Sequence, residues 1–200
     1  VDKSKRSKNS KKFIFPSKCL CGFPTKKEIN LVTKKIDAVR RCTRGYECDF
    51  TAREKLKHIV SKDAFDIEGL GKKVIDNFWE IKFIRTPADI FSLNYDKIER
   101  LEGWGKLSIK NLKKAVDDSK KIALDRFIYS IGIRHIGQEN AKILGEFFKT
   151  SKKFSELFSS KKRKVVLENL YDLDGIGETQ VKSIEDFFSN QKNSNIIQSL

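Results

Sequence analysis

The sequence has no methionine, only three prolines and two histidines, and no cysteine after residue 48. Because Val1 stands where a translated chain would carry Met, we expect a piece of a longer protein. No apolar run approaches the roughly 20 residues of a membrane helix, and no signal peptide is visible. No Gly-x-x-x-x-Gly-Lys phosphate loop occurs, and neither histidine lies in a pattern typical of an activated nucleophile. His58 is expected on a helix surface.

The charge of the chain is positive and unevenly placed. The net charge is +15, with 42 Lys and Arg against 27 Asp and Glu, which favours an acidic partner. Residues 1–62 carry +12 of this charge and residues 63–200 only +3. If the later part binds nucleic acid, we therefore expect it to use backbone donors and a few well-placed cations.

Four short glycine turns recur along the last two-thirds of the chain. Three of them, at 67–71, 101–105 and 173–177, read apolar, acidic, Gly, apolar, Gly. The fourth, at 133–137, keeps this frame but has His135 at the first glycine position. Aligned on that position, the steps are 34, 32 and 40 residues. A period of this size indicates one supersecondary unit used several times.

An amphipathic helix pattern follows each turn, with apolar residues at i, i+3 and i+4 spacing. The first backbone N–H groups of a helix have no partner within the helix, and glycine lets another backbone approach closely. A Gly-x-Gly turn that enters a helix can therefore present N–H donors to an anion such as a DNA phosphate. Each unit resembles the helix-hairpin-helix motif, although a single Gly-x-Gly is also an ordinary helix–helix turn.

All four cysteines, Cys19, Cys21, Cys42 and Cys48, lie in the first quarter of the chain. Two pairs separated by a strand-rich insert predict a zinc ribbon, with a β-hairpin formed by residues 29–32 and 36–41. The first pair is Cys-x-Cys instead of the usual Cys-x-x-Cys. A strained zinc site, a weakened site and reduced thiols without metal all remain open at this point.

Several longer stretches carry a family resemblance. Thr51-Ala52-Arg53-Glu54 reads as a capping box that opens a helix. It is followed by the specific segments 64–71, 86–91 and 126–137, the last of which includes Gly-Ile-Arg-His-Ile-Gly. Taken with the four-cysteine module before it, this order closely resembles the C-terminal half of the bacterial NAD-dependent DNA ligases, from about Phe13 to Leu200.

The resemblance implies a role in sealing nicks in DNA during replication and repair. In that family a lysine of a Lys-x-Asp-Gly motif takes AMP from NAD, and this chain has no such motif; residues 35–38 come nearest but lack the glycine. We therefore expect no catalytic residue here, zinc as the cofactor of this chain, and NAD and magnesium only in the parent chain. The implied partners are nicked double-stranded DNA and upstream adenylation and oligonucleotide-binding domains, for a monomer in the bacterial cytoplasm at the nucleoid, with no membrane.

The candidate sites follow from the cysteines and the turns. The candidate metal ligands are Cys19, Cys21, Cys42 and Cys48. The candidate DNA-binding residues are Gly69, Gly71, Lys72, Gly103, Gly105, Lys106, Arg134, His135, Gly137, Gly175, Gly177 and Lys182. Each lysine could equally be part of a solvated helix face, and His135 could simply fill its turn position.

The predicted fold is mainly α, with four helix-hairpin-helix motifs preceded by a small β zinc-ribbon module. We expect a disordered linker at 1–12, the ribbon at 13–50, a connecting helix at 51–65, the helix-hairpin-helix domain at 66–188 and a short terminal helix at 189–200. The four hairpins are expected to pair as two pseudo-symmetric units, because one hairpin cannot bury its apolar face alone.

Two other functions use the same motifs. One is a DNA-binding scaffold of recombination or excision repair without enzymatic activity. The other is a base-excision glycosylase, which would place a catalytic Lys or Asp in a pocket just beyond a hairpin. Lys142 and Lys182 fall beyond hairpins, but each continues a helix face.

Overall fold

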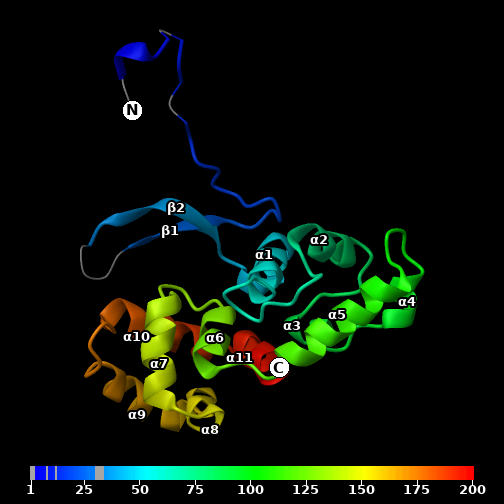
Figure 1. The fold of residues 1–200 in the computed structure, drawn as a ribbon. Helices are drawn as coiled ribbons and strands as arrows, with labels where there is room; N and C mark the ends of the chain where they lie inside the picture. Colours follow the sequence, from blue (N-terminus) through cyan, green and yellow to red (C-terminus); the bar gives the residue numbers. More distant parts are fainter. Residues whose placement is uncertain (1–2, 8, 12, 30–33) are drawn as a thin grey trace.

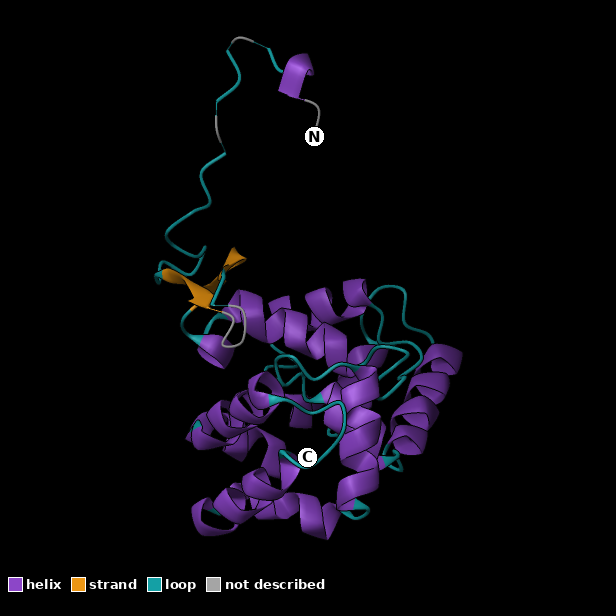
Figure 2. Cartoon of the chain, turned by 90° about the vertical axis from the view of Figure 1, so that its left-hand side faces the viewer, coloured by secondary structure: helices purple, strands orange, loops and turns teal. Residues whose placement is uncertain are grey.

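A computed structural model of the chain describes residues 3–7, 9–11, 13–29 and 34–200. The protein is mainly α-helical with one small antiparallel sheet, which confirms the predicted fold class. The N-terminal segment extends away from the body of helices, and the sheet lies between the two (Figures 1 and 2). Across the described residues, no helix is both long and apolar enough to cross a membrane.

The helices and strands follow one another along the chain with short connections. In order they are η1 (Lys3–Lys5), β1 (Thr25–Ile29), β2 (Ile36–Cys42), η2 (Gly45–Glu47), α1 (Asp49–Ile59), α2 (Lys72–Glu80), α3 (Pro87–Ile90), α4 (Tyr95–Glu99), α5 (Lys106–Ser119), α6 (Leu124–Ser130), α7 (Gln138–Phe148), α8 (Ser151–Phe154), η3 (Ser155–Phe158), α9 (Ser160–Leu170), α10 (Glu178–Ser189) and α11 (Gln191–Gln198).

The sheet pairs β1 with β2 in antiparallel register, from Thr25 opposite Cys42 to Ile29 opposite Ile36. The first strand was predicted at residues 29–32, but β1 ends at Ile29, so the start of this strand was predicted wrongly. Residues 30–33 lie outside the described part of the chain. The error has a physical reason: the run of residues before Ile29 is polar and charged, so no apolar alternation marks it as a strand.

Helix α1 begins before the predicted capping box. Its N-cap is Cys48, whose carbonyl oxygen accepts a hydrogen bond from the Ala52 amide at 2.8 Å. Thr51 is therefore inside the helix, and the prediction of Thr51 as the N-cap is wrong. As a result the last cysteine of the candidate metal site is joined directly to the helical body.

The helices build two hydrophobic cores. The first core gathers buried residues between Ala52 and Val116, from α1 to α5, and includes the first two turns. The second gathers buried residues between Ile128 and Ile197, from α6 to α11, and includes the last two turns. Phe127 packs against both cores. Each core thus contains two of the recurring hairpins.

Polar contacts join the two cores. Arg126 of α6 donates from Nε to the Ala64 carbonyl (2.9 Å) and from Nη2 to the Lys62 carbonyl (2.6 Å). His58 Nε2 lies 2.9 Å from the Tyr129 carbonyl oxygen, and the two rings are in edge contact. The expectation that His58 is a surface residue is wrong, because its ring lies between α1 and α6. These contacts hold the two halves in one orientation.

Candidate nucleic-acid interface

The four turns have the same backbone hydrogen bond. In each, the amide of the fourth residue donates to the carbonyl oxygen of the first, at 3.1–3.2 Å; the donor residues are Leu70, Trp104, Ile136 and Ile176. A four-residue turn of this kind needs a positive φ at its third residue when it is of type II. The recurring sequence frame therefore corresponds to a recurring backbone structure.

The third residue of every turn is in the left-handed region. Gly69, Gly103 and Gly175 have φ of 91°, 83° and 85°, and His135 has φ of 60°. Histidine is tolerated there more often than most residues with a side chain, although glycine is preferred. His135 thus takes the conformation of the glycine it replaces, and the irregular turn keeps the geometry of the others.

The second glycine of each turn is the N-cap of the helix that follows. Gly71, Gly105, Gly137 and Gly177 precede α2, α5, α7 and α10, and all four are exposed. Among the described residues, no side chain caps the helix at Gly71, Gly105 or Gly137. These three helices therefore begin at an exposed glycine without a side-chain cap, and the dipole of a helix favours an anion at its start.

The last turn differs from the other three. The Gly177 amide donates to Oε1 of Gln180 at 3.2 Å. One of the donors predicted to bind DNA is therefore already used within the chain. This cap was missed from the sequence, although Gln three residues after an N-cap is the spacing of a capping box and could have revealed it.

The turns pack in pairs. A Cβ added to Gly69 would lie 3.5 Å from Cδ1 of Leu112 on α5, and one added to Gly175 would lie 2.8 Å from Cδ1 of Ile143 on α7. Each of these turns thus rests on the helix of the other hairpin in its own core. The side-chain amide of Asn140 adds a contact with the Gly175 carbonyl oxygen at 3.5 Å.

The charges around the helix starts divide the hairpins into two kinds. Helices α2 and α5 have no acidic residue in their first turn and begin with exposed lysines, Lys72, Lys73 and Lys106. Helices α7 and α10 carry Glu139 and Glu178 there. The first two hairpins therefore present the more favourable field for an anion.

Two of the predicted cations have internal partners. Arg134 Nη1 lies 2.5 Å from a carboxylate oxygen of Glu28 in β1, and its Nε donates to His135 Nε2 at 2.8 Å. Lys182 pairs with Asp186 on the same helix at 3.2 Å. Arg134 thus ties the third turn to the sheet, a contact that the sequence did not indicate.

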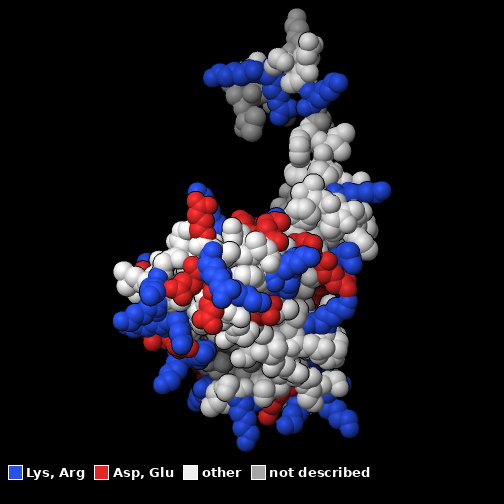
Figure 3. Space-filling model, turned by 90° about the vertical axis from the view of Figure 1, so that its right-hand side faces the viewer, with Lys and Arg blue, Asp and Glu red and all other residues white. Residues whose placement is uncertain are grey.

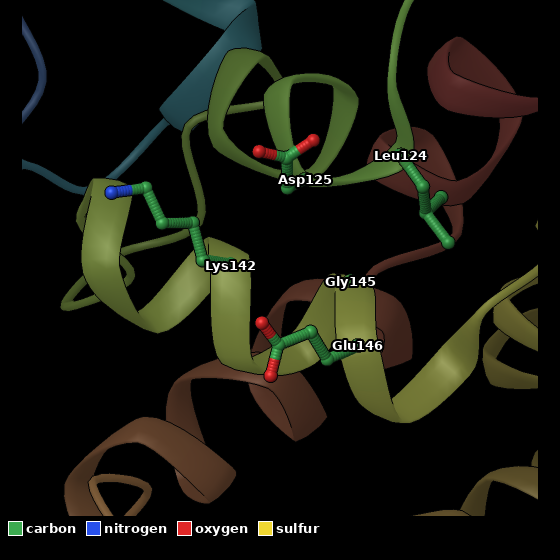
Figure 4. Close-up of a pocket in the computed structure, with 5 residues that line it drawn as sticks. All are labelled: Leu124, Asp125, Lys142, Gly145 and Glu146. Atoms are coloured by element: carbon green, nitrogen blue, oxygen red, sulfur yellow. The ribbon is translucent and has the colours of Figure 1, made fainter.

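Lys142 lines a shallow pocket between α6 and α7, together with Leu124, Asp125, Gly145 and Glu146 (Figure 4). Its ammonium pairs with Glu139 at 2.9 Å, and this hydrogen bond raises the pKa of Lys142 above its ordinary value. A protonated amine is not a nucleophile. The arrangement therefore gives no support to a glycosylase that uses this lysine.

The four cysteines come together although the sequence separates them. Their sulfur atoms all lie within 4.8 Å of one another, with Cys19 and Cys48 at 3.7 Å and Cys21 and Cys42 at 3.5 Å. These distances are far from the roughly 2.05 Å of a disulfide. They are close to the sulfur–sulfur separation of about 3.8 Å that follows from tetrahedral Zn–S bonds of about 2.3 Å. The cluster therefore fits a metal ion.

The irregular Cys-x-Cys pair is accommodated by a turn. The Gly22 amide donates to the Cys19 carbonyl at 2.9 Å, and Gly22 has φ of 84°. The chain reverses here, so Cys19 and Cys21 do not sit on one extended strand. This reversal resolves the geometric difficulty that the sequence presented.

The environment of Cys48 favours a thiolate. Burial raises its pKa, but hydrogen bonds from the hydroxyl and amide of Thr51 outweigh that effect and, with contributions from the Cys21 and Cys19 thiols, the pKa of Cys48 falls to about 6. A thiolate at a helix N-terminus is a suitable metal ligand.

Charge on the surface follows the division seen in the sequence. In the view of Figure 3 the helical body shows Lys and Arg interspersed with Asp and Glu, whereas the N-terminal segment that projects from it shows Lys and Arg. On this face the charges of the helical body are therefore mixed, in agreement with the small net charge of residues 63–200.

The architecture defines a helix-hairpin-helix module joined to a four-cysteine module. The family described as "Helix-hairpin-helix motif" matches residues 126–197, which contain the third and fourth turns. The whole chain is similar to DNA ligases: it is 54% identical to the DNA ligase of Pelagibacter ubique (strain HTCC1062) over 202 residues, covering 100% of this chain. It is 40% identical to that of Parvibaculum lavamentivorans and 38% identical to that of Sinorhizobium fredii, each over 98% of this chain.

This similarity confirms the resemblance to bacterial DNA ligases. The chain spans about 29% of the length of each of these relatives, so it corresponds to one part of such a protein.

Proposed function

We propose that this chain is the DNA-binding portion of an NAD-dependent DNA ligase and that it grips the duplex backbone around a nick without reading bases. The observation that carries this proposal is the repeated exposed helix start at Gly71, Gly105 and Gly137, each lacking a side-chain cap among the described residues. Backbone amides that contact phosphates carry no sequence information, so the grip would depend on duplex geometry and deformability.

The paired packing of the turns supports a grip that extends along the duplex. Arg126 and His58 hold the two cores together, so their helix starts keep a fixed relation to one another. A rigid set of phosphate contacts positions the duplex and contributes no chemical step itself. In this proposal the chain acts as a monomer on nicked DNA at the bacterial nucleoid, during replication and repair.

Cys19, Cys21, Cys42 and Cys48 would hold zinc. Four thiolates in a closed site supply folding energy and no open position for a substrate. The ion would join the turn at residues 19–22 to the end of β2 and to the start of α1, because the ligands come from these three places. Adenylation and the use of NAD and magnesium would belong to upstream domains of the parent chain.

The test replaces the N-cap glycines by residues whose side chains can accept hydrogen bonds from the first amides of each helix, at positions where a side chain does not disturb the fold. A Cβ at Gly71, Gly105 or Gly137 meets nothing within 4 Å, and none of these residues has positive φ. Asp or Asn at an N-cap accepts hydrogen bonds from the first amides of the helix and is preferred over Gly by a few tenths of a kcal/mol. Three triple variants should be compared: all three glycines to Asp, to Asn or to Ala.

Binding of a labelled nicked duplex should be measured by fluorescence anisotropy over a range of salt concentrations. We expect the Asp triple variant to bind most weakly and the Asn variant to bind more weakly than the Ala variant. The association constant K falls as salt rises. The magnitude of the slope of log K against log salt concentration should decrease by about 0.9 for each phosphate group that the variant no longer binds.

Ser159→Asp is the control for one added carboxylate at a helix start, because Ser159 is the exposed N-cap of α9, a helix that no glycine turn precedes. It should leave binding unchanged. Wild-type affinity and salt slope in both the Asp and the Asn triple variants would refute the proposal.

A further inference from the structure

One cation of the proposed DNA contact is already paired within the chain. Arg134 lies in the turn at 133–137, shortly before Gly137, the N-cap of α7. Its Nη1 lies 2.5 Å from Oε2 of Glu28 in β1. A carboxylate of the four-cysteine module therefore neutralises the arginine of the third turn.

This ion pair is accessible to an anion from solution. The side chains of Glu28 and Arg134 are 32% and 28% exposed, so neither is enclosed by the fold. A guanidinium presents a planar fork of N–H donors that fits a phosphate as well as it fits a carboxylate. A phosphate of the duplex could therefore take the place of the carboxylate.

Each partner has a second contact that remains when the pair separates. Oε1 of Glu28 lies 4.0 Å from Nε of Arg41, so the carboxylate keeps a cation beside it. Nε of Arg134 donates to Nε2 of His135 at 2.8 Å, which holds the inner end of the guanidinium while the outer nitrogens change partner. The exchange thus leaves neither charge without a partner.

We propose that Glu28 competes with the duplex for Arg134. In the free chain the carboxylate holds the guanidinium, and when DNA binds, a backbone phosphate replaces the carboxylate. This inference rests on the proposed function, since the phosphate belongs to the same duplex. Because a partly exposed ion pair contributes little free energy, we expect the competition to change the affinity for DNA by about two- to fivefold.

The test is a double-mutant cycle in the 200-residue chain, with Glu28→Gln, Arg134→Gln and the two substitutions together. The control is Glu47→Gln, which also removes one carboxylate from the four-cysteine module and breaks an ion pair with the helical body, in this case with Lys192 of α11. Fluorescence anisotropy gives the affinity for a nicked duplex over a range of salt concentrations. The thermal unfolding midpoint without DNA is measured for every variant.

We expect Glu28→Gln to bind about two- to fivefold more tightly than the wild type with the same salt slope, because Arg134 contacts the same phosphate in both. Arg134→Gln should bind more weakly, and the magnitude of its slope should decrease by about 0.9. The double variant should bind as Arg134→Gln does, and Glu47→Gln as the wild type does. The midpoint of Glu28→Gln should be equal to or below that of the wild type, so its tighter binding would not come from a more stable fold.

Three results would overturn the inference. One is an equal gain from Glu28→Gln in the Arg134→Gln background, which would mean that Glu28 only repels phosphate. Another is weaker binding by Glu28→Gln, which would mean that the bound state needs the ion pair as a brace. The third is unchanged affinity and salt slope in Arg134→Gln.

The cycle can be separated from the test of the proposed function. If the triple N-cap variants weaken binding but the cycle shows no coupling, the helix starts contact DNA and Glu28 does not compete. If the cycle gives the expected result and the N-cap variants bind as the wild type does, Arg134 contacts DNA and the proposed role of the helix starts fails.

Discussion

Gly103 and Gly105 allow the turn geometry to be tested by two substitutions that differ in one property. Both residues are exposed, and a Cβ at either position meets no atom within 4 Å. Their φ angles, however, are 83° and −104°. Substitution by Ala at Gly103 therefore introduces left-handed strain without a clash, whereas at Gly105 it changes only the quality of the N-cap.

The magnitudes follow from this contrast. A side chain in the left-handed region costs about 1–2 kcal/mol, so Gly103→Ala should lower the free energy of unfolding by that amount. For a chain of this size, such a decrease corresponds to a fall in the thermal midpoint of roughly 2–8 °C. Gly105→Ala replaces an acceptable N-cap with a poor one and should lower the free energy of unfolding by only about 0.5 kcal/mol. Gly103→Asn should lie between wild type and Gly103→Ala, because Asn tolerates positive φ.

The assay is thermal and urea unfolding followed by far-ultraviolet circular dichroism, with the three variants and the wild type under the same conditions. Equal destabilisation by Gly103→Ala and Gly105→Ala would refute the reasoning, since it would mean that φ at the first glycine does not govern the turn. A neutral Gly103→Ala would refute it as well, and would remove the geometric basis for aiming the amides after Gly105.

Two further predictions concern the metal site and a half-buried lysine. The purified chain should contain about one zinc ion, and a chelator should lower its thermal unfolding midpoint. Cys21→Ser should reduce the metal content to near zero. A wild-type chain without metal and with four freely titrating thiols would contradict this prediction. Burial lowers the pKa of Lys55 to about 8 from an ordinary 10.5, and its Nζ lies 4.0 Å from the centre of the Tyr46 ring. Between these two pH values the folded state binds fewer protons than the unfolded state, so stability should rise with pH there. Lys55→Met should reduce this rise relative to wild type in urea unfolding at pH 7, 8, 9 and 10, and the rise that remains below pH 9 would come from the lowered pKa of Cys48. An unchanged rise would contradict the assignment to Lys55.

Features that depend on a few neighbouring residues were determined by the sequence itself. The frame of the four turns predicted where α2, α5, α7 and α10 begin, because positive φ and helix starts are local properties of the backbone. The same frame correctly included the turn with His135, whose conformation matches that of the glycines. The apolar spacing after each turn likewise predicted the buried faces of the helices, since helical periodicity is local.

Features that depend on residues far apart in the sequence were decided only by the tertiary structure. The approach of Cys19 to Cys48 and of Cys21 to Cys42 required the reversal at Gly22 and the placement of α1, neither of which a spacing rule contains. His58 meets Tyr129 across 71 residues, and Glu28 meets Arg134 across an even longer separation, so no local pattern could assign their partners. Local conformational preference sets where each helix begins, whereas packing of the two cores decides which side chains meet and which amides remain open to a ligand.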